Sequence, residues 1–170
     1  EFVKAAPGKY FFASPGPGSA NRLEMERFMK ATGIQMTHVP YKGGAGPAIT
    51  GLLGGETSVM VVTLSSAARQ VRGGKLKLLA VSSEQREPMF PEVPTVAETP
   101  GLEGFSSGSW QGIIGPARLP PEIISKLYNE VRRVVALPDV SEKLTSQGSR
   151  PISKTPQETA QWIAAEKERW

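Results

Sequence analysis

A glycine-rich turn, GPG, lies between the apolar run KYFFA and a stretch with helical spacing that begins at Ser19. A strand, a glycine turn and a helix start leave free backbone N–H groups and the positive end of the helix dipole facing one spot. This pattern predicts a generic anion pocket that suits a carboxylate as well as a phosphate. The alternative is that Ser19 only caps the helix and that the glycines only make a tight turn.

Nucleotide-binding patterns do not fit this turn. A dinucleotide fingerprint needs a third glycine where Asn21 stands, and a Walker loop needs Gly-Lys followed by Ser or Thr, a triplet that the sequence lacks. We therefore expect no nucleotide and no other cofactor.

Hydrolase chemistry also lacks its residues. GFSSG, centred on Ser106, matches the nucleophile-elbow pattern, but the elbow needs a helix after the serine and a histidine later in the chain. The single histidine, His38, comes earlier and lies inside a predicted strand, where we expect it to be packed or hydrogen-bonded. With one histidine and no cysteine, a transition-metal site is not expected either. The sequence thus favours a protein that is not an enzyme.

Two further polar loops follow predicted strands. In YKGGAGPA, which begins at Tyr41, Lys42 can supply a positive charge and the next two glycines let the backbone approach a ligand closely. In TLSSA, which begins at Thr63, hydroxyls can cap a helix or bond a ligand oxygen. Each loop alone is an ordinary β-to-α turn, but three polar junctions at one sheet edge indicate a binding site.

Short β-type runs alternate with amphipathic stretches in the first half of the chain, which predicts an α/β fold with a mostly parallel, doubly wound sheet. Predicted strands cover residues 10–14, 35–39, 57–64, 75–83 and 109–116, and the 57–64 run is apolar enough for burial on both faces. Predicted helices cover residues 19–32, 47–53, 65–72, 121–136 and 139–146, with a last helix opened by Thr155, Pro156 and Glu158. The passage between residues 84 and 104 is proline-rich and is predicted to be irregular.

Composition limits the partners. The chain has 170 residues and a formal net charge of +4, and its basic residues are spread along the chain rather than gathered in a stripe. We therefore expect no nucleic-acid partner. No apolar run reaches the roughly 20 residues that cross a bilayer, and the first residues lack the apolar core of an export signal.

Three long runs resemble the solute-binding receptors of tripartite tricarboxylate transporters, the Bug family. They are VPYKGGAGPAITGLLGGETSVM, KLKLLAVSSEQREPMFPEVPTVAETPGLEGF and SWQGIIGPARLPPEIISKL. The resemblance covers essentially the whole sequence. It implies a periplasmic-binding-protein-like receptor of two α/β lobes that closes on a small carboxylic acid, a dicarboxylate, tricarboxylate or aromatic acid, and delivers it to the membrane subunits of the transporter.

The resemblance also implies that this chain is part of a longer protein, without its export signal and most of its first lobe. Residues 1–107 would form the second ligand-binding lobe, and residues 108–170 would be the crossover segment and helices that complete the first. We therefore expect weakened binding by this chain alone. Its carboxyl-terminal helices would expose an apolar face, so the alternative is an interaction module that forms a homodimer through that face.

The family's ligand-facing loops correspond to the turn after the first strand and to VPYKG. With the polar junctions described above, the predicted ligand-binding residues are Ser14, Gly16, Gly18, Ser19, Ala20, Tyr41, Lys42, Gly43, Gly44 and Thr63. This chain has Val62 and Thr63 where relatives often have an Asp-Asn pair, which leaves the identity of the acid open.

Overall fold

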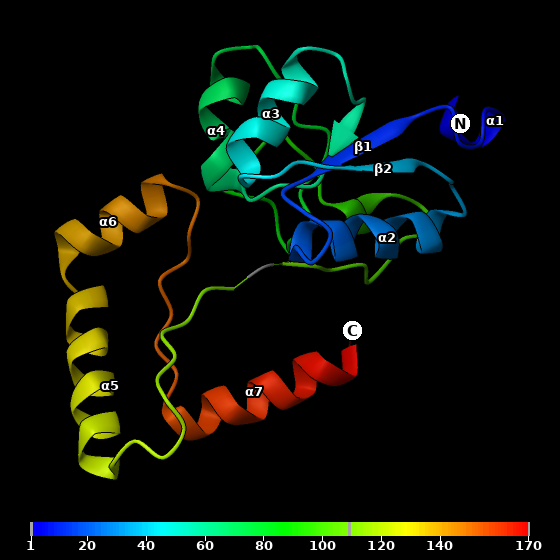
Figure 1. The fold of residues 1–170 in the computed structure, drawn as a ribbon. Coiled ribbons are helices and arrows are strands. Elements are labelled where there is room, and N and C mark those ends of the chain that lie inside the picture. The colour runs from blue at the N-terminus through cyan, green and yellow to red at the C-terminus, as the bar shows by residue number, and fades with distance from the viewer. Residues whose placement is uncertain (1, 109, 170) are drawn as a thin grey trace. The chain divides into compact units, whose positions relative to one another are not determined.

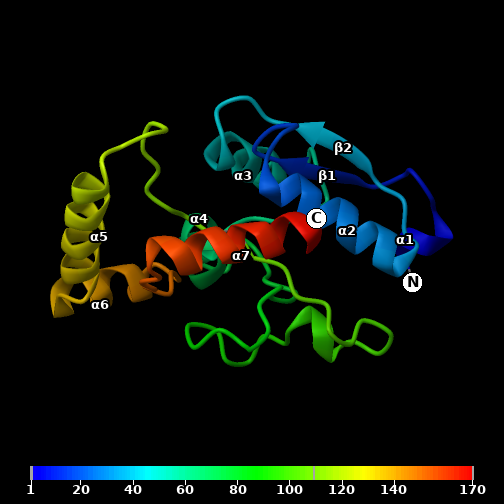
Figure 2. The ribbon, with the colours of Figure 1, turned by 90° about the horizontal axis from the view of Figure 1, so that it is seen from below.

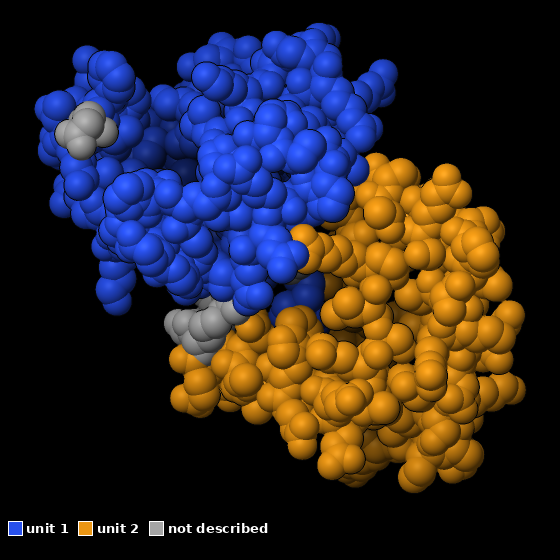
Figure 3. All heavy atoms as spheres, turned by 180° about the vertical axis from the view of Figure 1, so that it is seen from behind, with its two compact units in different colours: residues 1–110 blue, residues 111–170 orange. Residues whose placement is uncertain are grey.

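The computed structural model describes residues 2–108 and 110–169, and it divides the chain into two compact units, Glu1–Trp110 and Gln111–Trp170 (Figures 1 and 3). The first unit contains a sheet with helices, whereas the described part of the second contains helices and loops only. The assignment of residues 1–107 and 108–170 to two different lobes stays a prediction.

Three parallel strands form the sheet of the first unit. They are β1 (Phe11–Ser14), β2 (Thr37–Pro40) and β3 (Val59–Met60), in the order β2-β1-β3. Because β1 is central, it pairs with β2 along its whole length and with β3 through Phe12 and Ala13. The predicted α/β fold with a parallel sheet is therefore confirmed.

Helices cover both faces of this sheet. In Figure 1, α2 (Ala20–Thr32) lies on one side of the strands, and α3 (Ala45–Leu53) and α4 (Leu64–Arg72) lie on the other. A short helix, α1 (Phe2–Ala5), precedes β1 and was not predicted. The sheet is thus doubly wound, and each crossover helix begins just beyond the carboxyl end of a strand.

The core beneath α2 explains where that helix lies. Phe12 of β1 is fully buried and clusters with Met25 and Met29, which recur at helical spacing on one face of α2. The helix begins after its N-cap Ser19 and ends at Gly33, as the sequence predicts.

A second cluster anchors the proline-rich passage. Phe90 and Val93 pack with Val81 and with Ala68 of α4. Figure 2 shows this passage as loops, in green, with the 3-10 turn η1 (Val96–Glu98) as its helical element. The predicted irregular character is confirmed, and the buried side chains show that the passage is ordered by packing.

The strand predictions at 57–64 and 75–83 are wrong in extent. β3 has two residues, both half-buried, because the chain turns beyond Met60 toward the start of α4. In the 75–83 run, Val81 makes one parallel bridge to Thr95: its N–H donates to Pro94 O, and its carbonyl accepts from Val96 N–H. The run pairs with the proline-rich passage and therefore does not extend the sheet.

The predicted strand at 109–116 is absent over residues 110–116, and Ser109 lies outside the described residues. No described strand pairs with this segment, and Ile113 and Ile114 are 76% and 89% exposed. A strand needs a neighbour that accepts and donates its backbone hydrogen bonds, so apolar character alone does not create one here.

The second unit contains α5 (Pro121–Val135), α6 (Pro138–Ser146) and α7 (Pro156–Arg169). At the start of α7, Glu158 Oε2 accepts the Thr155 N–H at 2.7 Å, which confirms the predicted reach of this carboxylate back to the cap. No side chain of residues 110–168 is buried among the described ones. These helices therefore form without a closed apolar core of their own.

A surface ion pair makes the first unit sensitive to acid. Arg86 donates two hydrogen bonds to the Glu98 carboxylate, and Glu98 also accepts the Thr95 N–H at 2.9 Å. These bonds, the one from Arg86 first, lower the pKa of Glu98 from 4.5 to about 2. A carboxylate whose pKa is lowered by folding stabilises the protein above its unfolded-state pKa and loses that contribution as the pH falls.

We predict that Glu98→Gln lowers the free energy of unfolding at pH 7 and that its difference from wild type shrinks between pH 4.5 and about 2. Urea unfolding at several pH values measures this difference. The control is Glu84→Gln, at an exposed site on the same passage, which should match wild type throughout. A pH-independent deficit in Glu98→Gln would contradict the assignment.

Candidate functional site

The N-terminus of α2 is built by the turn that follows β1. Ser19 Oγ accepts the Arg22 N–H at 3.3 Å and donates to Gly16 O at 2.8 Å, while Ser19 N–H also donates to Gly16 O, at 3.2 Å. The N–H groups of Gly18 and Ala20 flank the cap, where an α-helix provides no intrahelical acceptor. The predicted cap is confirmed, and the turn directs amide donors beyond the carboxyl end of β1.

Ser14 holds this turn from inside the protein. Its side chain is fully buried, and Ser14 Oγ lies 3.2 Å from Gly16 N, 2.9 Å from Gly16 O and 2.6 Å from His38 Nε2. Because all these partners belong to the protein, the hydroxyl ties the turn to β2. Its contact with a ligand stays a prediction.

His38 is hydrogen-bonded and packed, as predicted. Its ring stacks on Phe12 at 4.9 Å between centroids, and its Nε2 meets Ser14. Burial, and then the positive charge of Arg22, lower the pKa of His38, while Glu26 opposes them. Sequence reasoning missed its link to the turn, because Ser14 and His38 are distant in sequence and meet only through the pairing of β1 with β2.

The loop after β2 is joined to the first turn. Tyr41 N–H donates to Ser14 O at 3.0 Å, so the two loops share a backbone hydrogen bond. Gly43 and Gly44 have φ angles of 98° and 93°, which side-chain-bearing residues rarely adopt, and Gly44 is the N-cap of α3. This confirms that the loop needs both glycines, and Lys42 beside them is exposed.

The Tyr41 side chain closes one side of this loop. Its hydroxyl donates to Glu56 Oε2 at 2.7 Å, a hydrogen bond that raises the pKa of Tyr41. The ring lies directly over Gly51 in α3, where a Cβ atom would overlap it. The tyrosine position therefore depends on the absence of a side chain at Gly51.

The third junction precedes α4. Thr63 is the N-cap of this helix, and its Oγ1 lies 3.0 Å from Ser66 Oγ. Thr63 is half-buried, so its hydroxyl is less enclosed than that of Ser14.

The sheet topology brings these three junctions to one edge. Because β1, β2 and β3 are parallel, their carboxyl ends face the same way, and α2, α3 and α4 begin there. All ten predicted residues lie at this edge, together with helix N-termini, the exposed Lys42, and Arg22, which is ion-paired with Glu26 at 3.5 Å. Anion binding at this edge stays a prediction. Direct ligand contacts by these residues stay a prediction.

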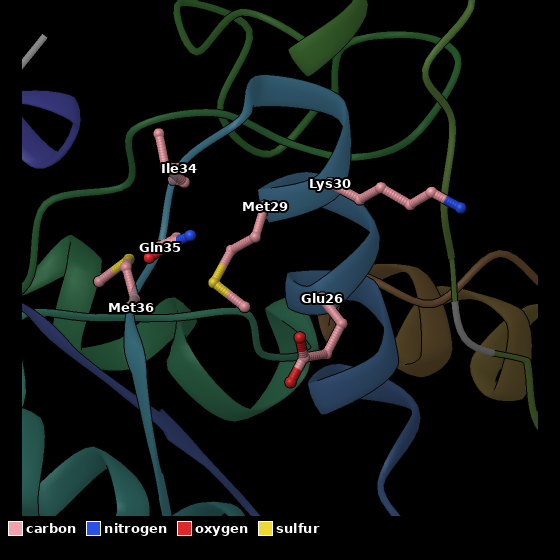
Figure 4. A pocket seen from close by; sticks show the side chains of 6 residues that line it. All are labelled: Glu26, Met29, Lys30, Ile34, Gln35 and Met36. Atoms are coloured by element: carbon pink, nitrogen blue, oxygen red, sulfur yellow. The ribbon is translucent and has the colours of Figure 1, made fainter. Parts of the chain in front are cut away.

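A pocket of about 460 Å³ lies elsewhere, beside the second half of α2 (Figure 4). Its lining is Glu26, Met29, Lys30, Ile34, Gln35 and Met36, which includes none of the predicted residues. The sulfur and aliphatic groups belong to the core beneath α2, and the Glu26 carboxylate repels an anion. This hollow is a surface gap above the core and does not match the chemistry of the loops.

Residues 2–108 and 110–169 contain neither a metal-ligand cluster nor a membrane-spanning helix. Over this part of the chain, no three His, Cys, Asp or Glu residues gather as a metal site would require. None of the helices described there combines the length and apolar character of a bilayer-spanning segment.

The model of the tripartite tricarboxylate transporter family receptor matches residues 1–170, and the chain belongs to this family. The resemblance of the sequence to these receptors is thereby confirmed. Receptors of this family are periplasmic and form a non-enzymatic class of proteins.

Two curated relatives match nearly the whole chain and extend well beyond it. Protein BugT of Bordetella pertussis is 35% identical over 167 residues, which are 98% of this chain and 51% of that protein. A Pseudomonas protein from the tcbD-tcbE intergenic region is 34% identical over 173 residues, which are 100% of this chain and 51% of that protein. The chain thus spans about half the length of these relatives.

Solved structures share the fold. The Rhodopseudomonas palustris protein Rpa4515 with adipate superimposes with a TM-score of 0.92 at 29% identity, covering 99% of this chain and 56% of that one. MatC from Rhodopseudomonas palustris, with bound malate, gives a TM-score of 0.87 at 30% identity, covering 99% of this chain and 58% of that one. These two relatives each hold a small dicarboxylate.

We predict that Gly51→Ala destabilises the protein by about 1–3 kcal/mol, because the new methyl group displaces the Tyr41 ring and breaks its bond to Glu56. The control is Gly46→Ala in the same helix, where a Cβ meets open space; it should be neutral or stabilising by up to about 1 kcal/mol. Urea unfolding of both variants measures the difference. Equal stabilisation of the two would show that the Tyr41 ring moves aside freely.

Proposed function

We propose that this chain provides one side of the ligand-binding cleft of a periplasmic receptor that captures a small carboxylic acid for a tripartite tricarboxylate transporter. The observation that carries the proposal is the gathering of three polar strand-to-helix junctions at one sheet edge, in a family with adipate- and malate-bound relatives. The transporter's membrane subunits would then receive the acid.

In this proposal the carboxylate sits at the start of α2. The N–H groups of Gly18 and Ala20 lie beside it, the Ser19 N–H would have to exchange its bond to Gly16 O for the ligand, and a helix N-terminus stabilises negative charge there. Lys42 adds a positive charge from the neighbouring loop, and the Thr63 hydroxyl adds a donor from the third junction. Ser14 contributes by holding the turn, since its hydroxyl already bonds Gly16 and His38.

The Gly43-Gly44 backbone completes the proposed side of the cleft. With both φ angles positive, this stretch of loop can approach a ligand without side chains in the way. Tyr41 borders the loop and is held by Glu56.

Binding by this chain alone is proposed to be weak. Hydrogen bonds to a charged group contribute about 1.5–3 kcal/mol each before ordering costs, and an edge open to water loses part of that. We propose that residues 1–107 are one lobe and that residues 108–170 complete the other lobe of a longer protein. Closure of two lobes would exclude water and add contacts.

The proposal is tested by amide NMR with malate, adipate and inorganic phosphate as probes. Saturable shifts at Ser19, Ala20 and Gly43 with the dicarboxylates, and smaller ones with phosphate, are expected. A titration that leaves these amides unchanged while others shift would place the site elsewhere. A titration with no shifts at all would refute binding by this chain.

We predict that Lys42→Met weakens malate binding about two- to fivefold, because an exposed charge contributes up to about 1 kcal/mol. The effect should shrink with added salt, which screens it. Lys30→Met, an equally exposed lysine near the other end of α2, is the control and should bind as wild type does. NMR or calorimetric titration measures both, and equal loss in the two would indicate a general charge effect.

A second candidate function, an interaction module that forms a homodimer, is favoured by one observation. Four apolar side chains of α5 are 39–47% exposed: Ile123, Ile124, Leu127 and Val134. An exposed apolar stripe of this kind favours association.

If α5 mediates self-association, sedimentation will show a mass that rises with concentration. Leu127→Asp should abolish that rise, because it puts a charge into the apolar stripe. Ser125→Asp, which adds the same charge at an exposed polar position of the helix, should leave it unchanged. A wild-type monomer at every concentration would exclude this candidate.

A further inference from the structure

His38 lies one hydrogen bond away from the turn that begins α2. In the parallel register His38 is opposite Phe12, two residues before Ser14, so all three side chains share the sheet face that α2 covers. Ser14 Oγ is within hydrogen-bonding distance of His38 Nε2 and of both Gly16 backbone groups. A buried hydroxyl thus connects the single imidazole of the chain to the turn.

The Ser14 hydroxyl has one proton, so its donation depends on His38. We take neutral His38 as the tautomer with its proton on Nδ1, so that Nε2 accepts the Ser14 O–H and Ser14 Oγ accepts the Gly16 N–H. When His38 is protonated, Nε2–H donates to Ser14 Oγ, and the Ser14 O–H then turns to Gly16 O. The Ser14 hydroxyl proton therefore points to His38 Nε2 in the first state and to Gly16 O in the second.

The second arrangement crowds the Gly16 carbonyl. Gly16 O already receives Ser19 Oγ at 2.8 Å and Ser19 N–H at 3.2 Å, and a carbonyl oxygen has two lone pairs. A firm third bond from Ser14 therefore competes with the Ser19 hydroxyl. Once released, that hydroxyl becomes a donor at the start of α2, where the carboxylate is proposed to bind.

We infer that His38 is a positioning residue for the carboxylate site: through Ser14 it sets the hydrogen bonding of the Gly16–Ser19 turn, and its protonated form favours the bound carboxylate. For its ligand this inference rests on the proposed function. The released Ser19 donor and the added positive charge act in the same direction. By linkage, a bound carboxylate must make His38 easier to protonate.

The ionisable groups around the ring are few. Arg22 and Glu26, both from α2, act on His38 with opposite signs, and β1 presents Phe12 and Ser14, which do not titrate in this range. Burial and then Arg22 lower the pKa of His38 from its ordinary value of 6.5. The switch therefore operates below about pH 6.5.

The experiment is an NMR pH titration from about pH 8 to 5.5, where carboxylates stay largely ionised, with and without malate. Since the chain has one histidine, its ring signals are unambiguous. We expect the amide chemical shifts of Gly16 and Ser19 to change with pH, with the same midpoint as the His38 ring signals. Saturating malate should raise that midpoint by about half a pH unit, which equals about threefold tighter binding to the protonated form.

Three variants separate positioning from general structure. In Ser14→Ala, His38 should still titrate, but the amide chemical shifts of Gly16 and Ser19 should no longer change with its protonation. His38→Gln keeps a group that can hydrogen-bond Ser14 and should bind malate with an affinity that does not change over this pH range. Glu26→Gln removes the other titratable neighbour and should preserve the coupling.

Two results would overturn the inference. In the first, the amide chemical shifts of Gly16 and Ser19 do not change with pH while His38 titrates. In the second, these shifts still change with the His38 midpoint in Ser14→Ala. Failure of the proposed function looks different. A wild-type chain that binds no malate refutes that function, and the ligand-free titration of the amides still decides whether His38 governs the turn.

Discussion

The pairing of β1 with a parallel neighbour on each side is the constraint on which the first unit depends. Phe12 and Ser14 on one side of this strand are fully buried, and Ala13 between them is nearly so. Parallel strands require crossover connections, which here are helices on both faces of the sheet. The same constraint forces three loops to one edge. The gathering of three polar loops at this edge is therefore a consequence of strand direction.

Hydrogen bonds among β1, β2 and the loops that follow them hold this edge in place. The Ser14 hydroxyl ties the turn before α2 to β2 through His38. The Tyr41 N–H bond to Ser14 O joins the second loop to the first. A ligand site needs donors held in place before the ligand arrives, and buried hydrogen bonds of this kind provide that order.

The two units differ in how they are stabilised. The first has apolar clusters under α2 and around Phe90, whereas residues 110–168 have no buried side chain among those described. Amphipathic helices such as α5 gain most of their stability from packing of their apolar face. The chain spans about half the length of the curated relatives BugT and the tcbD-tcbE intergenic protein.

Local sequence signals determined much of this protein. Ser19 and Gly33 set the ends of α2, Thr155 and Glu158 set the start of α7, and the alternation of apolar runs with amphipathic stretches predicted a parallel α/β sheet. The family could be read from the succession of whole segments.

What local pattern could not determine was pairing: the 75–83 run is apolar like a strand, yet Val81 pairs with Thr95 and the sheet ends at β3. Likewise the type and position of Ser14 and His38 were visible, but their contact exists only because β1 and β2 lie side by side. Backbone caps act over three or four residues and leave a mark in the sequence, whereas contacts across a sheet depend on which segments meet, and the tertiary structure alone decided that.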